Sequence, residues 1–242
     1  MLQLQNIKKS FDKKVVLKDI NLSVGKGEIV SLLGKSGSGK STLLNIIAGF
    51  EEVDSGSGKY RDITIFDEKF FCEPQERHIG FVFQNYALFP HLTIEKNITF
   101  GIDKKDKEFK AKKVKELLKL IQMEGYEKKY PHEISGGQQQ RIAIGRVLAR
   151  DSDLILFDET FSSIDSILKN ELMSEIKDII KSYNKTAIFV THCPKEAKFL
   201  SDKIAYIEYG EIIQFDTPKN IAQNPKNDTI RELFSQEEER VK

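Results

Sequence analysis

The chain has 242 residues, of which 39% are hydrophobic, and its 38 basic and 37 acidic residues give a net charge of +1. This composition argues against a disordered chain, and the charge balance argues against a surface dominated by nucleic-acid or anionic-membrane binding. By its length the chain forms one large domain or two small ones, and no segment has the composition of a long linker.

The two cysteines, Cys72 and Cys193, lie far apart and form no C-x-x-C motif. We therefore expect neither a disulfide framework nor a structural zinc site, and we expect a reducing compartment. No run approaches the roughly 18 apolar residues that a membrane span needs, and the amino terminus lacks the apolar core of a signal peptide. Any work at a membrane would then depend on a partner.

The first part of the chain combines predicted strands with one clear helix. Residues 2–11 and 15–24 alternate in hydrophobicity, as antiparallel strands do. Residues 29–33 form a compact apolar run that predicts a buried strand, and a Gly/Ser-rich turn separates it from a predicted helix over residues 41–48. Gly49 then stops this helix as a C-cap glycine does.

A lysine-rich segment over residues 103–119 follows in the middle of the chain. Acidic residues are interleaved with its lysines, and apolar residues recur at helical spacing, namely Val114, Leu117, Leu118 and Ile121. We interpret the segment as a surface helix with a buried stripe rather than as an arm that binds nucleic acid.

Further short apolar runs predict more strands along the chain. They cover residues 79–83, 154–157 and 186–190, and residues 204–209 and 211–215 predict two strands joined by a tight turn. Strands that alternate with helical patterns are typical of an α/β protein with a largely parallel sheet.

A phosphate-binding motif lies between the strand at 29–33 and the helix after it. Residues 34–41 match the pattern G-x-x-x-x-G-K-[ST]. The glycines let backbone N–H groups point at phosphate oxygens, and the helix start adds its positive dipole end. We predict that Lys40 reaches the β- and γ-phosphates and that Ser41 ligates Mg²⁺. The chain then binds a nucleoside triphosphate; a flexible Gly/Ser loop is the alternative.

Two neighbouring carboxylates, Asp158 and Glu159, follow the strand at 154–157. They emerge at the carboxyl end of the strand, where α/β sheets place ligands, and the turn there lets both approach one ligand. Asp158 would hold Mg²⁺, directly or through water, and Glu159 would act as general base on the attacking water. The alternative is a pair of exposed loop acids. The second carboxylate favours hydrolysis over phosphoryl transfer to a metabolite.

A second possible anion site opens the helical stretch predicted over residues 138–150. Ser135 occupies a natural N-cap position before Gly136 and Gly137, but no strand and no lysine accompany it. An incomplete second site suggests that it serves a nucleotide held by another copy of the chain. A capped surface helix remains the alternative.

In order and spacing, these motifs resemble the ATP-binding subunits of ABC transporters, and the likeness extends from residue 1 to about residue 234. The resemblance implies an α/β P-loop NTPase (RecA-like) core with an antiparallel β subdomain and an inserted helical subdomain. On this basis we expect a single ABC ATPase domain over residues 1–242, with the core at 1–85 and 151–234 and the helical subdomain at about 86–150.

The resemblance further implies a head-to-tail dimer with two ATP molecules. Each ATP would lie between the P-loop of one subunit (residues 34–42) and the signature run of the other (residues 135–138). The implied nucleotide contacts are Phe11, Gly34, Lys35, Ser36, Gly37, Ser38, Gly39, Lys40, Ser41, Thr42, Ser135, Gly136, Gly137 and Gln138.

Other roles also follow from the resemblance. Gln84 contacts Mg²⁺ or the water and reports to the membrane subunit, and His192 contacts the γ-phosphate rather than serving as a structural histidine. Phe11 stacks on adenine or is a core phenylalanine. Asp165, in the D-loop over residues 162–165, lies at the dimer interface.

Three positions depart from the family pattern. Thr160 replaces the usual proline, Ile134 replaces the commoner leucine, and Cys193 stands where aspartate is frequent. None removes a reactive group, so we expect an active ATPase with ATP and Mg²⁺ as its ligands.

Residues 84–93 resemble importer subunits that serve ferric iron, sulfate, molybdate, polyamines and sugars. By analogy we expect uptake of an inorganic ion, iron first, through a permease that docks near residues 84–91 and works with a solute-binding protein. The chain would be cytoplasmic and peripheral on the inner membrane face. Many such subunits carry a carboxyl-terminal regulatory domain, which we do not expect here.

Two rival functions remain. One is a soluble ABC ATPase acting on nucleic acid or ribosomes, although such proteins usually carry tandem cassettes or long coiled-coil inserts. The other is a P-loop phosphotransferase, which leaves the run from Ser135 to Gln138 unexplained.

Overall fold

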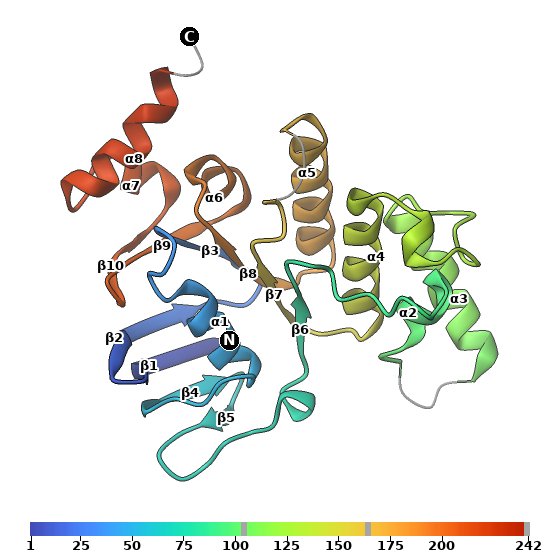
Figure 1. Cartoon of the computed structure of the whole chain (residues 1–242), viewed down its shortest axis with the longest axis horizontal. Coiled ribbons are helices and arrows are strands. Elements are labelled where there is room, and N and C mark those ends of the chain that lie inside the picture. The colour runs from blue at the N-terminus through green and yellow to red at the C-terminus, as the bar shows by residue number, and fades with distance from the viewer. Residues whose placement is uncertain (103–105, 163–165, 240–242) are drawn as a thin grey trace.

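The computed structural model describes residues 1–102, 106–162 and 166–239 (Figure 1). It contains an antiparallel sheet in the order β2-β1-β4-β5. Residues that alternate between buried and exposed form β1 and β2, which confirms the predicted antiparallel pair. The four strands are β1 (Leu2–Phe11), β2 (Lys14–Val24), β4 (Ser55–Tyr60) and β5 (Ile63–Phe66).

The second sheet has the order β10-β9-β3-β8-β7-β6. Its strands from β9 to β6 are parallel, and β10 is antiparallel to β9. Both faces of the inner strands are covered, which is why they occur in the sequence as unbroken apolar runs. The strands are β3 (Ile29–Leu33), β6 (Ile79–Val82), β7 (Leu154–Asp158), β8 (Thr186–Thr191), β9 (Lys203–Glu208) and β10 (Glu211–Asp216).

Helices flank the two sheets (Figure 1). Helix α1 packs in the apolar core shared by the two sheets, α2 to α4 gather beside β6, and α7 and α8 lie near β10. The helices are α1 (Lys40–Ala48), α2 (Ile94–Thr99), α3 (Lys107–Leu120), α4 (Gly136–Ala149), α5 (Ser166–Ser182), α6 (Pro194–Leu200), α7 (Pro218–Gln223) and α8 (Asp228–Glu239), with short 3₁₀ helices at Pro74–Glu76 and Pro131–Glu133. Within the described ranges, no helix is long and apolar enough to cross a bilayer.

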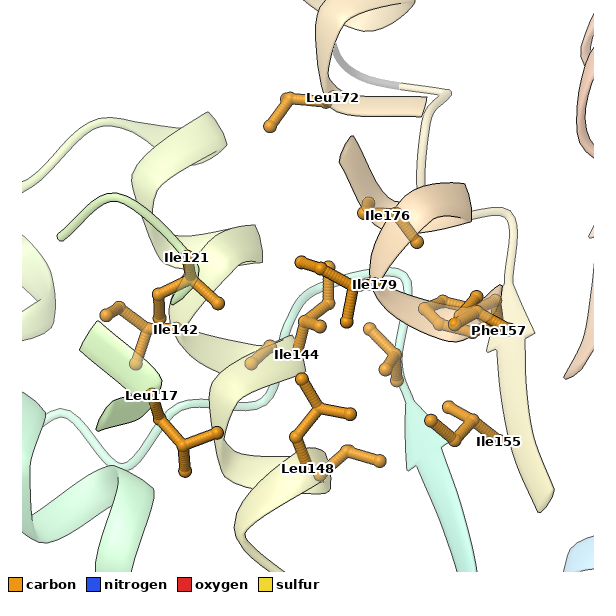
Figure 2. Close-up of a cluster of buried hydrophobic side chains, with 14 of the residues drawn as sticks. Leu117, Ile121, Ile142, Ile144, Leu148, Ile155, Phe157, Leu172, Ile176 and Ile179 are labelled. Carbon is orange, nitrogen blue, oxygen red and sulfur yellow. The ribbon is translucent and has the colours of Figure 1, made fainter. Parts of the chain in front are cut away.

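Residues 107–119 of the lysine-rich segment lie in α3, and the predicted apolar stripe is buried. Figure 2 shows that α4 joins this stripe to the central sheet, with Ile142 on the side of Leu117 and Ile121. Ile144 and Leu148 of α4 belong to the same core as Ile155, Phe157 and the buried face of α5. The continuous core fixes the amino-terminal end of α4 relative to the strands that carry the candidate site.

Several boundaries differ by one or two residues from the sequence prediction, and two of these differences bear on the site. Helix α4 begins at Gly136, two residues earlier than predicted, because Ser135 caps it and the glycines adopt the first turn. Strand β6 ends at Val82, so Phe83 already belongs to the loop that leads to Gln84. The mixed α/β architecture, with an antiparallel sheet beside a mainly parallel one, is otherwise the one expected.

Candidate active site

The loop between β3 and α1 passes so close to neighbouring strands that it needs glycines at two points. A Cβ on Gly34 would lie 2.1 Å from the carbonyl oxygen of Ile207 in β9. Gly39 has φ +100°, and a Cβ there would lie 2.6 Å from a methyl carbon of Leu17. The motif glycines therefore hold the loop against β9 and β2, besides exposing its N–H groups.

Lys40 begins α1 and lies beneath this loop. Its side chain is 4% exposed, and its Nζ donates hydrogen bonds of 2.8 Å to the carbonyl oxygens of Gly34 and Lys35. Burial lowers the pKa of Lys40, and the negative charges of Glu159 and Asp158 oppose that shift. The ammonium is thus placed where a charged phosphate oxygen would be a stronger acceptor than a backbone carbonyl.

Ser41 and Asp158 bring two oxygen ligands together from separate elements. The Ser41 hydroxyl, in the first turn of α1, donates a 2.9 Å hydrogen bond to Asp158 Oδ1 at the end of β7. Burial and the neighbouring Glu159 carboxylate raise the pKa of Asp158, whereas the Ser41 hydrogen bond and Lys40 lower it. Paired hydroxyl and carboxylate oxygens suit the hard Mg²⁺ ion, so these residues fit the predicted metal.

Glu159 has an unusual backbone conformation, with φ +44°. Its N–H donates to the Val190 carbonyl on β8 at 3.2 Å, and its Oε1 lies 4.0 Å from His192 Nδ1. A left-handed conformation at a non-glycine residue costs energy and recurs at functional sites. Here it carries the carboxylate into the same cleft as Lys40.

The cleft has a volume of about 700 Å³ and runs along the P-loop, where Ser36, Gly37, Gly39, Ser41 and Thr42 contribute to its walls. Phe11 lines it from the end of β1 and is 42% exposed, so it is not a core phenylalanine. Lys9 Nζ lies 4.9 Å from the centre of the Phe11 ring. Stacking of this ring on adenine remains a prediction.

Not every predicted site residue reaches the cleft. Ser38 is buried beside Gly34, and Gln84 is exposed in the loop after β6, outside the cleft lining. His192 follows β8, its side chain is 60% exposed, and it lines no part of the cleft, although its Nδ1 lies 4.0 Å from Glu159 Oε1. Residues 163–165 of the predicted D-loop, with Asp165, lie outside the described residues.

The signature run forms the exposed start of α4. Ser135 Oγ accepts from the Gln138 N–H at 3.4 Å, and Gln138 Oε1 accepts from the Ser135 N–H at 3.0 Å. This reciprocal capping box leaves Gly136 on the surface, and no residue from 135 to 138 lines the cleft among the described residues. Figure 1 shows α1 and α4 on opposite sides of β6.

Among the side chains that sequence reasoning missed, Tyr209 lies at the site and Arg77 supports the helix that follows the P-loop. Tyr209 lines the cleft from the turn between β9 and β10, and its signal is an aromatic residue before the turn glycine. Arg77 is 2% exposed and binds the carboxyl-terminal carbonyls of α1 at Ile46 and Ile47. Its contacts span about 30 residues, and no local pattern predicts them.

Comparison with known proteins decides the family. The family model described as ABC transporter matches residues 17–162. The chain belongs to the ABC transporter family. The match includes the P-loop, the signature run and the Asp158–Glu159 pair.

Relatives of this ABC chain carry importer names. It is 40% identical over 239 residues to the sulfate/thiosulfate import ATP-binding protein CysA of Bacillus cereus, covering 96% of this chain and 66% of that protein. It is 40% identical over 228 residues to the Fe(3+) ions import ATP-binding protein FbpC of Fusobacterium nucleatum, covering 93% of this chain and 60% of that protein. The chain thus spans less than two thirds of the length of these two relatives.

A solved structure shares the ABC fold and confirms the expected fold class. The ATP-binding cassette MJ0796, in a dimeric post-hydrolysis state bound to ADP and Pi, superposes with a TM-score of 0.78 at 34% identity. The superposition covers 90% of this chain and 99% of that chain.

Proposed function

We propose that this ABC chain hydrolyses ATP to power the uptake of a small solute through partner membrane subunits. The observation that carries the proposal is the 2.9 Å hydrogen bond from Ser41, which lines the cleft together with Lys40 and Glu159, to Asp158 at the end of β7. Phosphate ligands, magnesium ligands and a candidate base converge there. That set has the composition of a hydrolytic site rather than of a simple binding site.

In the proposed mechanism, Lys40 and the loop N–H groups bind the phosphates and hold the γ-phosphate toward the end of β7. Ser41 and Asp158 would hold Mg²⁺, and the bound ion would neutralise charge on the phosphate oxygens. Glu159 accepts a proton from the water that attacks the γ-phosphate. His192, 4.0 Å from Glu159, would contact the same phosphate from the solvent side.

A second copy of the chain would complete the site. Ser135 and Gly136 expose a capped helix start that lines no part of the cleft of their own chain. Their N–H groups, with Ser135 and Gln138, would bind the γ-phosphate of ATP held by the other copy, in a head-to-tail dimer. The cassette MJ0796 is dimeric in its structure with ADP and Pi, which supports the proposal of a dimer.

An apolar groove on the surface supports the proposal that the chain binds a membrane partner. It has a volume of about 480 Å³ and adjoins Gln84, and its walls include Phe50, Phe81, Phe83, Phe89 and Phe100. Phe50 is 48% and Phe100 is 63% exposed, so the groove offers apolar surface to a partner. A permease helix docked there, within reach of the helical subdomain over residues 86–150, would keep the chain peripheral on the inner membrane face.

The cargo would be supplied to that permease by a solute-binding protein. Relatives named for sulfate/thiosulfate and for Fe(3+) match at 40% identity, and one named for spermidine/putrescine matches at 42%, so these names do not decide between an inorganic ion and a polyamine. Ferric iron remains our candidate by analogy.

Phosphate release from Mg²⁺-ATP by the purified chain tests the proposal. Glu159→Gln should keep ATP affinity and lose most turnover, because the amide cannot accept the proton. A phosphorylated metabolite in place of free phosphate would indicate a phosphotransferase. Turnover of Glu159→Gln near that of the unmodified chain would remove the assigned base, and rates indifferent to a candidate permease would favour a non-transport ATPase.

A further inference from the structure

Tyr209 is the most exposed large hydrophobic side chain among the described residues, at 79% exposure. It has φ +49° and is followed by Gly210 with φ +79°, in the two-residue turn between β9 and β10. An aromatic residue in the left-handed region is rare. The turn is also tied to β2, because the Lys18 N–H donates to the Gly210 carbonyl at 3.0 Å. This hydrogen bond holds the backbone of the turn in place, while the Tyr209 ring stays exposed.

The sheet order places this ring at one end of the cleft. β9 lies beside β3, the strand that leads into the P-loop, and runs parallel to it. β7, which carries Asp158 and Glu159, lies on the other side of β3 beyond β8. A nucleotide with its γ-phosphate toward these carboxylates directs its base away from β7. Tyr209 and Phe11 line the same cleft, and Tyr209 reaches it from the β9 side of β3, away from β7.

We propose that the Tyr209 ring packs against the base of the bound nucleoside triphosphate, as a second aromatic wall beside Phe11. The inference rests on the proposed ATP-binding role of this cleft. An aromatic ring offers a π-face to any base, and the constrained turn reduces the entropy lost on binding. Base stacking would also account for an exposed aromatic side chain on a strained backbone above a phosphate site.

The chain contains no tryptophan, so Tyr209→Trp introduces a single indole as a fluorescent reporter. ATP and inorganic tripolyphosphate both offer phosphates to the loop, but only ATP carries a base. We expect ATP to change the emission of Tyr209→Trp, and tripolyphosphate to compete with ATP without producing that change. Equal changes with both ligands, or none with ATP, would overturn the inference.

Two other reporters provide controls. Phe11→Trp probes the predicted base stack, and Tyr183→Trp places the indole just after α5, outside the cleft lining. If ATP alters Phe11→Trp but not Tyr209→Trp, only the present inference fails. If the chain binds neither ATP nor tripolyphosphate, the proposed function fails and this inference with it. If the emission of Tyr209→Trp changes only at high protein concentration, Tyr209 contacts another copy of the chain. That result would overturn the proposed contact with the nucleotide base.

Calorimetric measurement of the affinity for ATP and for tripolyphosphate provides an independent test of the contact between Tyr209 and the base. Tyr209→Ala should raise the Kd for ATP about five- to tenfold, the loss of one stacking contact, and should leave the Kd for tripolyphosphate unchanged. Tyr209→Phe keeps the ring and should bind ATP within about twofold of the unmodified chain. An unchanged Kd for ATP in Tyr209→Ala, or an equal loss for both ligands, would contradict a contact with the base.

Discussion

Replacing the buried Arg77 by methionine tests how the P-loop helix is anchored. The Arg77 Nε donates to the Cys72 carbonyl at 2.8 Å, and its Nη1 donates to the carbonyls of Ile46 and Ile47 at 2.6 and 3.0 Å. A cation at the carboxyl end of α1 also complements the helix dipole. Burial lowers the pKa of Arg77, and its two ring contacts are with Phe66 and Phe71.

Hydrogen bonds from a charged donor contribute about 1.5–3 kcal/mol each, and the cost of desolvating the guanidinium offsets part of their sum. We therefore expect Arg77→Met to lower the free energy of unfolding by about 2–4 kcal/mol, which for this chain length lowers Tm by about 5–15 °C. Urea titration of the nucleotide-free protein measures the change.

Arg150→Met is the matched control for this prediction. Arg150 is exposed and donates a hydrogen bond to the Gln75 carbonyl, in the 3₁₀ helix that precedes Arg77. Its replacement should cost less than about 0.5 kcal/mol. An equal, small loss in both variants would show that desolvation cancels the three hydrogen bonds, and would refute the anchoring role of Arg77.

Two further predictions concern Asp158 and Ser41, the proposed magnesium ligands. Burial raises the pKa of Asp158, so the unmodified chain should lose stability as pH rises from the ordinary carboxyl range toward the raised value. Asp158→Asn should remove that loss and be more stable than the unmodified chain at pH 7 without nucleotide, yet gain no thermal protection from Mg²⁺-ATP; a less stable variant at pH 7 would contradict this. Ser41→Ala should weaken ATP binding about tenfold with Mg²⁺ and have little effect in EDTA, as measured by calorimetry; equal losses in both conditions would argue against a metal-ligand role.

Much of the fold was predictable because its signals are local. The strand over Ile29–Leu33, the glycine loop and α1 are adjacent in sequence, and each depends on near neighbours for burial pattern and capping. Gly49 stops α1 with φ +88°, as its position predicted. The spacing of apolar residues likewise predicted helix α3.

Long-range contacts explain what sequence reasoning missed. Arg77 binds α1 from 30 or 31 residues away, and Tyr209 reaches the cleft only because β9 pairs with β3. The pairing of β4 with β1 joins Leu2 to Tyr60, and no turn signal between them fixes that register. Thr160 is buried with an unpaired hydroxyl in the described part of the chain, and nothing in the structure explains its replacement of the usual proline.

The central claim is that each active site takes its phosphate loop from one chain and its signature run from another. Lys40→Ala and Ser135→Arg should each abolish ATP hydrolysis on their own. In an equal mixture, half of the dimers pair one variant with the other, and each such pair has one intact site. Phosphate release should therefore recover to about a quarter of the unmodified rate, since a two-fold dimer has two equivalent sites. A mixture as inactive as its components would contradict the shared site.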